Sequence, residues 1–146
     1  MKRKYGLLGL LLVSGADAAA RNKVRPKNVL FIAVDDMKPA LGCYGDRVAR
    51  TPHIDALAAD GAVFRRAYCQ QAVSGPTRAS LLTGLRPEEV GVTELNTWMR
   101  AKVPDVVTLP QAFREAGYET RGVGKIFHGT KNSLDERSWS ERPSLY

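Results

Sequence analysis

The chain has few of the residues on which small cross-linked or zinc-binding proteins depend. Its 146 residues include two cysteines, Cys43 and Cys69, and two histidines, His53 and His128. The sequence contains no CxxC pair and no zinc-type spacing, and two cysteines at arbitrary spacing do not make a disulfide framework. A disulfide between Cys43 and Cys69 and a pair of buried free thiols are equal alternatives on this basis.

The sequence also lacks an apolar run of the roughly 20 residues that a permanent membrane helix needs. A shorter apolar run at 5–13 follows the basic residues Lys2, Arg3 and Lys4, and it precedes small residues in the pattern that signal peptidase cuts after. This order is typical of a signal peptide, which we predict over residues 1–20. It indicates a periplasmic or secreted protein with no stable membrane insertion; an N-terminal membrane anchor is the alternative.

Acidic residues are fewer than basic ones. The 22 lysines and arginines exceed the 15 aspartates and glutamates and give a formal charge of +7. Cleavage after residue 20 removes three basic residues and one acidic residue, which leaves +5. A moderately basic exported protein suits an anionic substrate such as a sulfated polymer, although solvated surface charge explains the excess equally well. The basic residues are scattered with little aromatic interleaving, so nothing supports nucleic-acid binding.

Apolar runs alternate with helical patterns along residues 21–146. Strands are predicted at 28–34, 62–68 and 119–123, of which the first is a continuous apolar run typical of a strand buried on both faces. Helices are predicted from Thr51-Pro52, from Gly75-Pro76 and over 109–116, and a glycine follows each of them. This alternation predicts an α/β fold with a mostly parallel sheet flanked by helices. The tail at 132–146 shows no clear element, and three strands make a poor independent domain, so we expect the fold to be incomplete in this chain.

Two carboxylates follow the first predicted strand. Asp35 and Asp36 stand at its carboxyl end, where ligands bind in open α/β sheets and where two carboxylates can converge on a hard cation. Taken alone, such a pair is more often a turn or a helix cap.

Two further groups follow predicted strands. Ser74 opens the segment S-G-P-T-R, ahead of a helix whose free N–H groups attract anions, and Arg78 lies one turn further on. Lys125 can neutralise an anion, and His128 can act as an acid or a base near neutral pH. Each group alone has an ordinary structural explanation, but their shared place at strand ends favours an enzyme. His53 lies at a helix start, and we interpret it as structural.

Four ordered segments together resemble the type I sulfatases of the alkaline-phosphatase-like superfamily. They are N-V-L-F-I-A-V-D-D-M-K, R-T-P-H-I-D-A-L-A-A-D-G-A-V-F, S-G-P-T-R-A-S-L-L-T-G and G-Y-E-T-R-G-V-G-K-I-F-H, and they run from about Lys27 to His128. Within that family, L-N-T-W-M-R and G-K-I-F-H resemble the iduronate-2-sulfatase subgroup most.

The resemblance implies a catalytic role for Ser74. It implies that Ser74 is oxidised to formylglycine, whose hydrate attacks sulfur with one hydroxyl and expels sulfate with the help of the other. It implies Asp35, Asp36 and the modified Ser74 as ligands of Ca²⁺, or of Mg²⁺ in some cases. Arg78 would hold the diol, while Lys125 and His128 would contact the sulfate. The substrate implied is a sulfated sugar or glycosaminoglycan.

Two departures from the family pattern matter. Most members carry cysteine at the Ser74 position; serine points to a bacterial source and to a radical-SAM type maturating enzyme as partner. The later motif that completes the metal site has no match before Tyr146. We therefore expect residues 21–146 to be the N-terminal portion of a catalytic domain and the chain alone to be inactive. A phosphate or phosphonate monoester hydrolase using unmodified Ser74, an inactive remnant and an anion-binding module are the alternatives.

Overall fold

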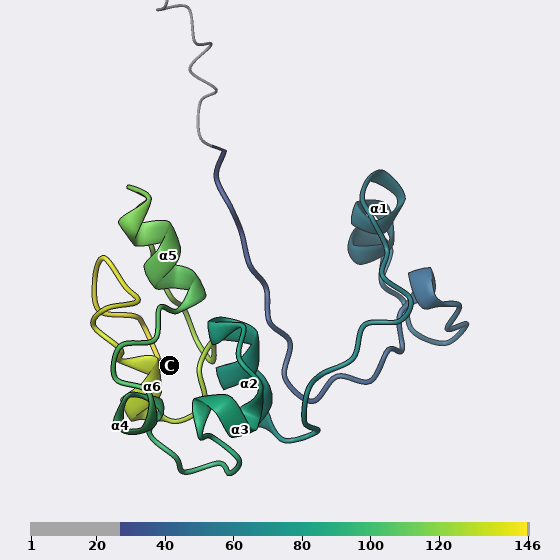
Figure 1. The fold of residues 1–146 in the computed structure, drawn as a ribbon. Helices are drawn as coiled ribbons and strands as arrows, with labels where there is room; N and C mark the ends of the chain where they lie inside the picture. The colour runs from purple at the N-terminus through teal and green to yellow at the C-terminus, as the bar shows by residue number, and fades with distance from the viewer. Residues whose placement is uncertain (1–26, 146) are drawn as a thin grey trace, which may run out of the picture. The chain divides into compact units, whose positions relative to one another are not determined.

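The structure is a computed structural model that describes residues 27–145, so the predicted signal peptide lies outside the described residues. Residues 27–31 are the described part of a first unit, and the second unit begins at Ile32. None of the helices in this part of the chain has the length and apolarity that a membrane crossing requires. The elements of the second unit (Figure 1) are η1 Gly42–Tyr44, α1 Pro52–Asp60, α2 Ser74–Thr83, α3 Pro87–Val90, α4 Met99–Lys102, α5 Leu109–Glu115 and α6 Thr130–Ser133.

Helix α1 begins where the Thr51-Pro52 signal predicts, but Thr51 does not cap it in the expected way. The Thr51 hydroxyl accepts from the Gly42 N–H at 2.9 Å and donates to the Asp55 carboxylate at 3.0 Å, so it ties η1 to α1. The expected apolar stripe is not buried within the described residues, because Ile54 is 44% and Leu57 71% exposed.

The two cysteines are free thiols in this structure. Cys43 is half-buried beside α1, where its N–H donates to the Asp55 carboxylate at 2.7 Å, and Cys69 is exposed. Neither of the alternatives considered from the sequence therefore describes Cys69, which is neither paired nor buried.

Helix α2 contributes Ala79 and Leu82 to the buried core. It begins at Ser74, one residue before the predicted Gly75-Pro76 start, and ends at Thr83. Gly84 follows as the cap, with a φ of 73° that few residues other than glycine adopt readily. The core of the second unit is a cluster of apolar side chains from α2, α3, α4, the loops that follow α3 and α5, and the tail. Its members are Ala79, Leu82, Val90, Val92, Met99, Phe127 and Trp139.

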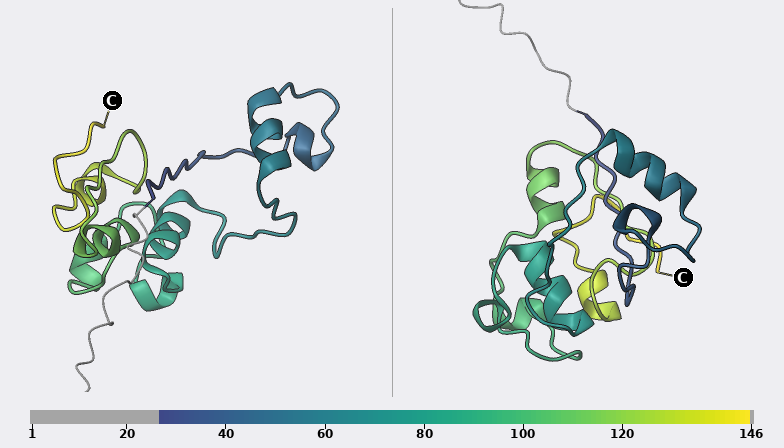
Figure 2. Two further views of the ribbon diagram at one scale, coloured as in Figure 1. Left: turned by 90° about the horizontal axis from the view of Figure 1, so that it is seen from above. Right: turned by 90° about the vertical axis from the view of Figure 1, so that its right-hand side faces the viewer.

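Residues 134–145 form no helix or ladder, as expected, but the tail packs on the core. The tail contains the end of α6, and Trp139 is 7% exposed and packs edge-to-face on Phe127 with ring centroids 6.0 Å apart. The Trp139 indole N–H donates to the Ser133 carbonyl at 2.9 Å. Figure 2 shows the tail in yellow running beside the helices of the same unit. The packing of this polar segment could not be predicted from a periodic apolar pattern, because one large aromatic side chain, Trp139, anchors it.

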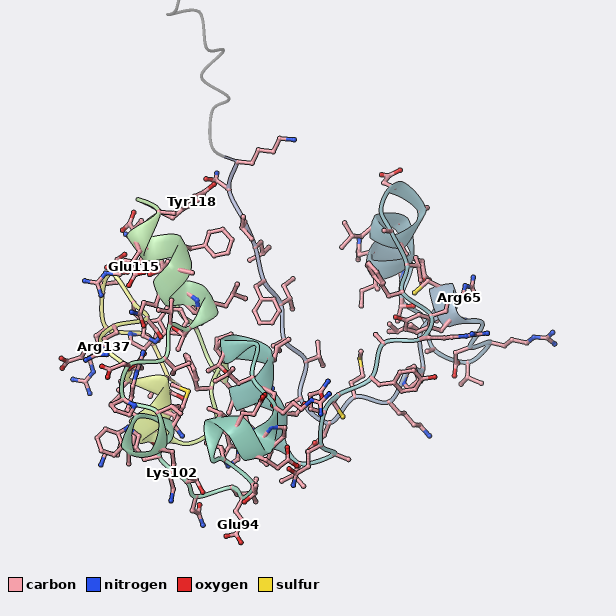
Figure 3. The ribbon with its side chains drawn as sticks, viewed as in Figure 1. Arg65, Glu94, Lys102, Glu115, Tyr118 and Arg137 are labelled. Atoms are coloured by element: carbon pink, nitrogen blue, oxygen red, sulfur yellow. The ribbon has the colours of Figure 1, made fainter. Side chains whose placement is uncertain are left out.

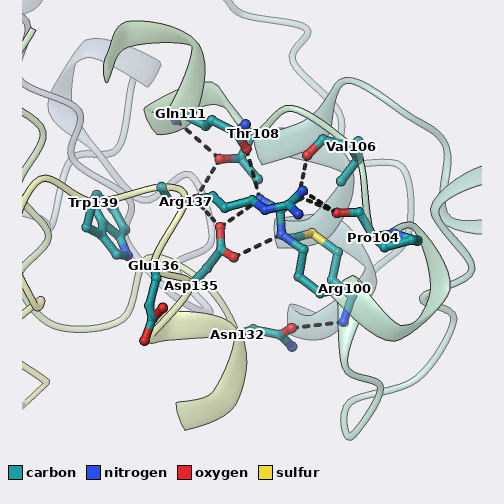
Figure 4. Close-up of polar contacts among 12 residues, drawn as sticks. Arg100, Pro104, Val106, Thr108, Gln111, Asn132, Asp135, Glu136, Arg137 and Trp139 are labelled. Atoms are coloured by element: carbon teal, nitrogen blue, oxygen red, sulfur yellow. Dashed lines mark hydrogen bonds and ion pairs between the residues drawn. The ribbon is translucent and has the colours of Figure 1, made fainter. Parts of the chain in front are cut away.

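A buried ion pair joins the tail to α4. The Arg100 guanidinium donates to both carboxylate oxygens of Asp135, from Nε at 2.9 Å and from Nη2 at 2.8 Å, and the two side chains are 9% and 6% exposed. The remaining Arg100 donors reach Gln111 Oε1 at 2.9 Å and the carbonyls of Pro104 and Val106 (Figure 4). Every guanidinium nitrogen thus has an acceptor, which a buried charge requires.

Asp135 is held as a carboxylate by this arrangement. Burial raises its pKa, but the hydrogen bonds from Arg100 and Ser138 and the charge of Arg100 outweigh burial, so that the pKa of Asp135 is lowered. The Ser138 hydroxyl, 2.5 Å from Asp135, also lies 2.6 Å from the hydroxyl of Thr108 at the start of α5.

The three predicted strands form no ladders among the described residues, and the segment 62–68 contains a turn at Arg65 and Arg66. Across residues 27–145 the β-pairing consists of an isolated parallel bridge between Val123 and Ser144. Leu30 is 84% and Ile32 70% exposed within the segment 28–34 that we predicted as a doubly buried strand. A strand is stable only when a neighbouring segment accepts its N–H groups and covers its faces, and among the described residues such pairing is limited to this one bridge. The predicted parallel sheet is therefore not formed by this part of the chain.

Charged side chains outside the core are dispersed. Arg65, Lys102 and Arg137 lie on three different segments, and each is exposed (Figure 3). Arg137 sits 3.6 Å from Asp105 in a pair whose side chains are 53% and 93% exposed. This distribution agrees with solvated surface charge as the source of much of the basic excess.

Candidate active site

Three segments that are distant in the sequence meet at the carboxylate of Asp35. Its Oδ1 accepts from the Ser74 hydroxyl at 3.1 Å and from Arg78 Nη2 at 2.9 Å. Its Oδ2 accepts from the ammonium group of Lys125. The structure therefore brings together Asp35, Ser74, Arg78 and Lys125, four of the six site residues that the sequence singled out.

Ser74 owes its position to the start of α2. Val73 is extended, with φ −140° and ψ 133°, and its carbonyl accepts the Thr77 N–H at 3.1 Å to open the helix. Gly75 is buried against another segment, so that an added Cβ would come within 2.8 Å of the Glu94 carbonyl oxygen. Sequence reasoning assigned Gly75 only to the helix start and missed this close approach, because nothing in the local sequence indicates which segment packs there.

The buried Arg78 side chain connects Asp35 to the segment that carries Lys125. Its side chain is 5% exposed, and Nη1 donates to the carbonyl oxygens of Lys125 at 2.6 Å and Ile126 at 2.8 Å. Nε and Nη2 donate to Asp35 at 3.3 and 2.9 Å. All three guanidinium nitrogens therefore donate to protein oxygens, and the arginine fixes Asp35 against the segment that carries Lys125.

Asp35 is strongly held in its charged form. The hydrogen bond from Lys125 is the largest cause and that from Arg78 the next; with a smaller contribution from Ser74 they lower the pKa of Asp35 from 3.8 to about 2, although desolvation opposes them. A carboxylate with this pKa is fully ionised at neutral pH.

The segment after residue 123 holds Lys125 by its backbone, while the Lys125 side chain is partly exposed. The Gly124 N–H donates to the Ser144 carbonyl at 2.8 Å, and Arg78 donates to the Lys125 carbonyl. Phe127, 2% exposed, anchors the segment in the core, whereas the Lys125 side chain is 30% exposed.

His128 and Asp36 are not joined to this cluster by any hydrogen bond among the described residues. His128 is half-buried, and its Nδ1 is buried without a hydrogen-bond partner in residues 27–145. The His128 carbonyl accepts from Asn132 at 3.0 Å. Asp36 is exposed and adopts a φ of 52°, a left-handed conformation that aspartate tolerates better than most residues.

The oxygen atoms around Asp35 suit a hard cation in kind but are few in number. Asp35 and Ser74 place a carboxylate and a hydroxyl oxygen 3.1 Å apart, and the Asp36 carboxylate follows in the chain. Cationic nitrogens of Arg78 and Lys125 already stand at both Asp35 oxygens, where a metal would bind. Ca²⁺ takes about 6–8 oxygen ligands, while residues 27–145 contain no group of three or more His, Cys, Asp or Glu side chains that could hold a metal ion. The residues thus fit Ca²⁺ or Mg²⁺ by donor chemistry, and water or other residues would supply the rest of the shell.

Comparison with known proteins assigns the family. A sequence model of the sulfatase family matches residues 27–137. The chain is 43% identical over 145 residues to iduronate 2-sulfatase of Homo sapiens, covering 93% of this chain and 26% of that protein. It is 36% identical over 120 residues to N-acetylglucosamine-6-O-sulfatase of Bacteroides thetaiotaomicron, covering 82% of this chain and 21% of that protein. It spans about a quarter of the length of these curated relatives. The chain belongs to the sulfatase family, whose alkaline-phosphatase-like fold is α/β.

Proposed function

We propose that the protein to which this chain belongs hydrolyses sulfate esters on a sulfated sugar or glycosaminoglycan, as its relatives named iduronate 2-sulfatase do on theirs. The observation that carries the proposal is the position of Ser74. It stands at the first turn of α2, 3.1 Å from the ionised carboxylate of Asp35, which also accepts from Arg78 and Lys125. Free N–H groups at a helix start and neighbouring cations favour a bound anion such as a sulfate ester.

In this proposal Ser74 is the precursor of formylglycine, whose hydrate supplies one hydroxyl to attack sulfur and another to expel sulfate. Asp35 and Asp36 would hold Ca²⁺ or Mg²⁺ together with residue 74, and the ion would polarise the reacting oxygens. Arg78 keeps Asp35 in place. Lys125 would bind the sulfate oxygens, and His128, whose buried Nδ1 lacks a partner among the described residues, would exchange a proton with the leaving oxygen.

The proposal extends to maturation and location. Serine rather than cysteine at position 74 calls for a radical-SAM type maturating enzyme as partner and suggests a bacterial source. The signal-peptide pattern at residues 1–20 suggests a periplasmic or secreted protein. We also propose that residues 21–146 form the N-terminal portion of the catalytic domain, since the chain spans 26% of its human relative. Sequencing past the Tyr146 codon tests this: an open frame with a further Asp-Asn or Asp-His motif is expected, and an immediate stop codon would contradict it.

Mass spectrometry of the peptide containing Ser74 tests the chemistry. The protein is purified from its native host or after coexpression with a radical-SAM type maturating enzyme. Conversion of Ser74 lowers the peptide mass by about 2 Da, because an alcohol becomes an aldehyde. Ser80, which is buried in α2, should keep its mass and serves as the internal control.

Activity is measured on a sulfated uronate disaccharide and on a phosphate monoester of the same leaving group. Sulfate release that depends on conversion of Ser74 supports the proposal. An unmodified Ser74 together with phosphate release would instead identify a phosphomonoester hydrolase. Full conversion without turnover on either ester would favour the alternative of an anion-binding module.

A further inference from the structure

The geometry points to Lys125 as a built-in counter-cation of Asp35 that a metal ion has to displace. This inference rests on the metal-binding role proposed above for Asp35. It concerns what occupies the carboxylate before the metal arrives, and therefore how tightly the metal binds.

Both oxygens of Asp35 are occupied by cationic groups of the chain. Oδ1 accepts from Arg78, whose side chain is 5% exposed, and Oδ2 accepts from the Lys125 ammonium, whose side chain is 30% exposed. A metal ion bound through Oδ2 would stand within a few ångströms of the Lys125 ammonium. Two cations at that spacing repel one another, so the metal binds Oδ2 more favourably when the ammonium turns away.

Only one of the two basic side chains can move away without disturbing the fold. Arg78 is fixed by the carbonyls of Lys125 and Ile126, and its removal would leave these acceptors unpaired. Lys125, in contrast, makes one side-chain hydrogen bond within residues 27–145, to Asp35, and its backbone stays anchored through the neighbouring residues Gly124 and Phe127. Rotation about its flexible stem is enough to release the carboxylate.

The consequence is an exchange of cations at the Asp35 carboxylate. Before metal binding, Lys125 neutralises Asp35 and blocks Oδ2. After metal binding, the freed ammonium remains within reach of Ser74, where an anionic ester would bind. Lys125 would therefore lower the affinity for the metal and become available to the substrate only once the metal is in place.

The test is a Ca²⁺ titration of the 146-residue chain, followed by ¹H–¹⁵N NMR of the Asp36 and Gly75 amides, which reports weak as well as tight binding. Lys125→Met should bind Ca²⁺ about three- to fivefold more tightly than the wild type, a change of the size that a partly exposed ion pair supports. Lys125→Arg keeps the charge and should restore wild-type affinity.

Lys131→Met is the matched control. It removes the same charge from a lysine whose ammonium lies over the Trp98 ring, 3.6 Å from the centroid, and not at Asp35. Equal affinity of Lys125→Met and Lys131→Met would overturn the inference, and so would the absence of any Ca²⁺-dependent shift. Far-UV circular dichroism checks that each variant keeps its helices.

Asp35→Asn separates this inference from the proposed function. If Asp35→Asn abolishes binding and Lys125→Met has no effect beyond the control, that result would support Asp35 as a metal ligand and reject Lys125 as its displaced counter-cation. If Asp35→Asn leaves binding unchanged, the metal role itself fails. Lysine acetylation with mass spectrometry gives a second readout: Ca²⁺ should speed modification of Lys125 and leave Lys131 unchanged, and an unchanged Lys125 rate would count against displacement.

Discussion

Arg78 donates from Nη2 to Asp35 Oδ1 across 2.9 Å and a sequence separation of 43 residues, and the arginine side chain is almost completely buried. The same guanidinium donates to two carbonyls of the segment that carries Lys125. One side chain on α2 therefore sets the mutual positions of the three segments that form the candidate site.

Arg78→Ala should destabilise the chain by about 3–5 kcal/mol, because it leaves a carboxylate short of a partner and two carbonyls without donors. Arg78→Lys should recover little of this loss, since an ammonium cannot reach Asp35 and both carbonyls in the geometry of a planar fork. Urea unfolding followed by far-UV circular dichroism measures the change. Arg65→Ala, at an exposed arginine, is the control and should alter stability by less than about 0.5 kcal/mol. Equal effects of the Arg78 and Arg65 variants would show that the contacts of Arg78 are not formed.

The stability contributed by Asp35 should depend on pH in one direction. Its pKa falls from 3.8 to about 2 on folding, chiefly through Lys125 and Arg78. A lowered pKa in the folded state gives stability that is present above the unfolded value and is lost as the pH falls through the folded one. The difference in Tm between the wild type and Asp35→Asn should therefore be constant above about pH 5 and shrink from there toward pH 2. A difference that grows on acidification would contradict the ion pairs at Asp35.

The Arg100–Asp135 pair should matter far more than an exposed pair. Asp135→Asn leaves the Arg100 charge buried without its counter-ion, which costs about 3–5 kcal/mol in comparable buried pairs. The matched control is Glu119→Gln, which removes one partner of Arg121 in a pair whose side chains are 61% and 63% exposed. The control should leave the urea midpoint unchanged, whereas Asp135→Asn should lower it clearly. If both variants behave alike, the tail is not held by this pair.

The two tryptophans should differ in fluorescence. Trp139 is 7% exposed in the core and Trp98 is 39% exposed beneath Lys131. In Trp98→Phe the remaining emission comes from Trp139 and should be blue-shifted and poorly quenched by acrylamide. In Trp139→Phe the emission of Trp98 should be red-shifted and readily quenched. Similar quenching of the two variants would show that the tail does not pack against Phe127.

The helix boundaries were largely predictable from short-range signals. The Thr51-Pro52 start, the glycine after α2 and the helix near 109–116 all appear within about one residue of their predicted places, because caps and glycine preferences act on the local backbone. The short helices α3, α4 and α6 were missed, since four-residue helices carry no periodic pattern. The packing of the tail was missed for a related reason: it depends on contacts of Trp139 with Phe127 and of Asp135 with Arg100, which no local pattern indicates.

By itself, the sequence determined the family, the set of candidate chemical groups and the local starts and ends of the main helices. These follow from residue types at fixed spacing and from backbone preferences that need no distant partner. Only the tertiary structure decided that Arg78 braces Asp35 rather than facing outward, that Lys125 occupies the same carboxylate, and that the predicted strand segments stay without ladders in the described residues. Each of these depends on which remote segments meet, because hydrogen-bond partners and strand neighbours are supplied by packing and not by local sequence.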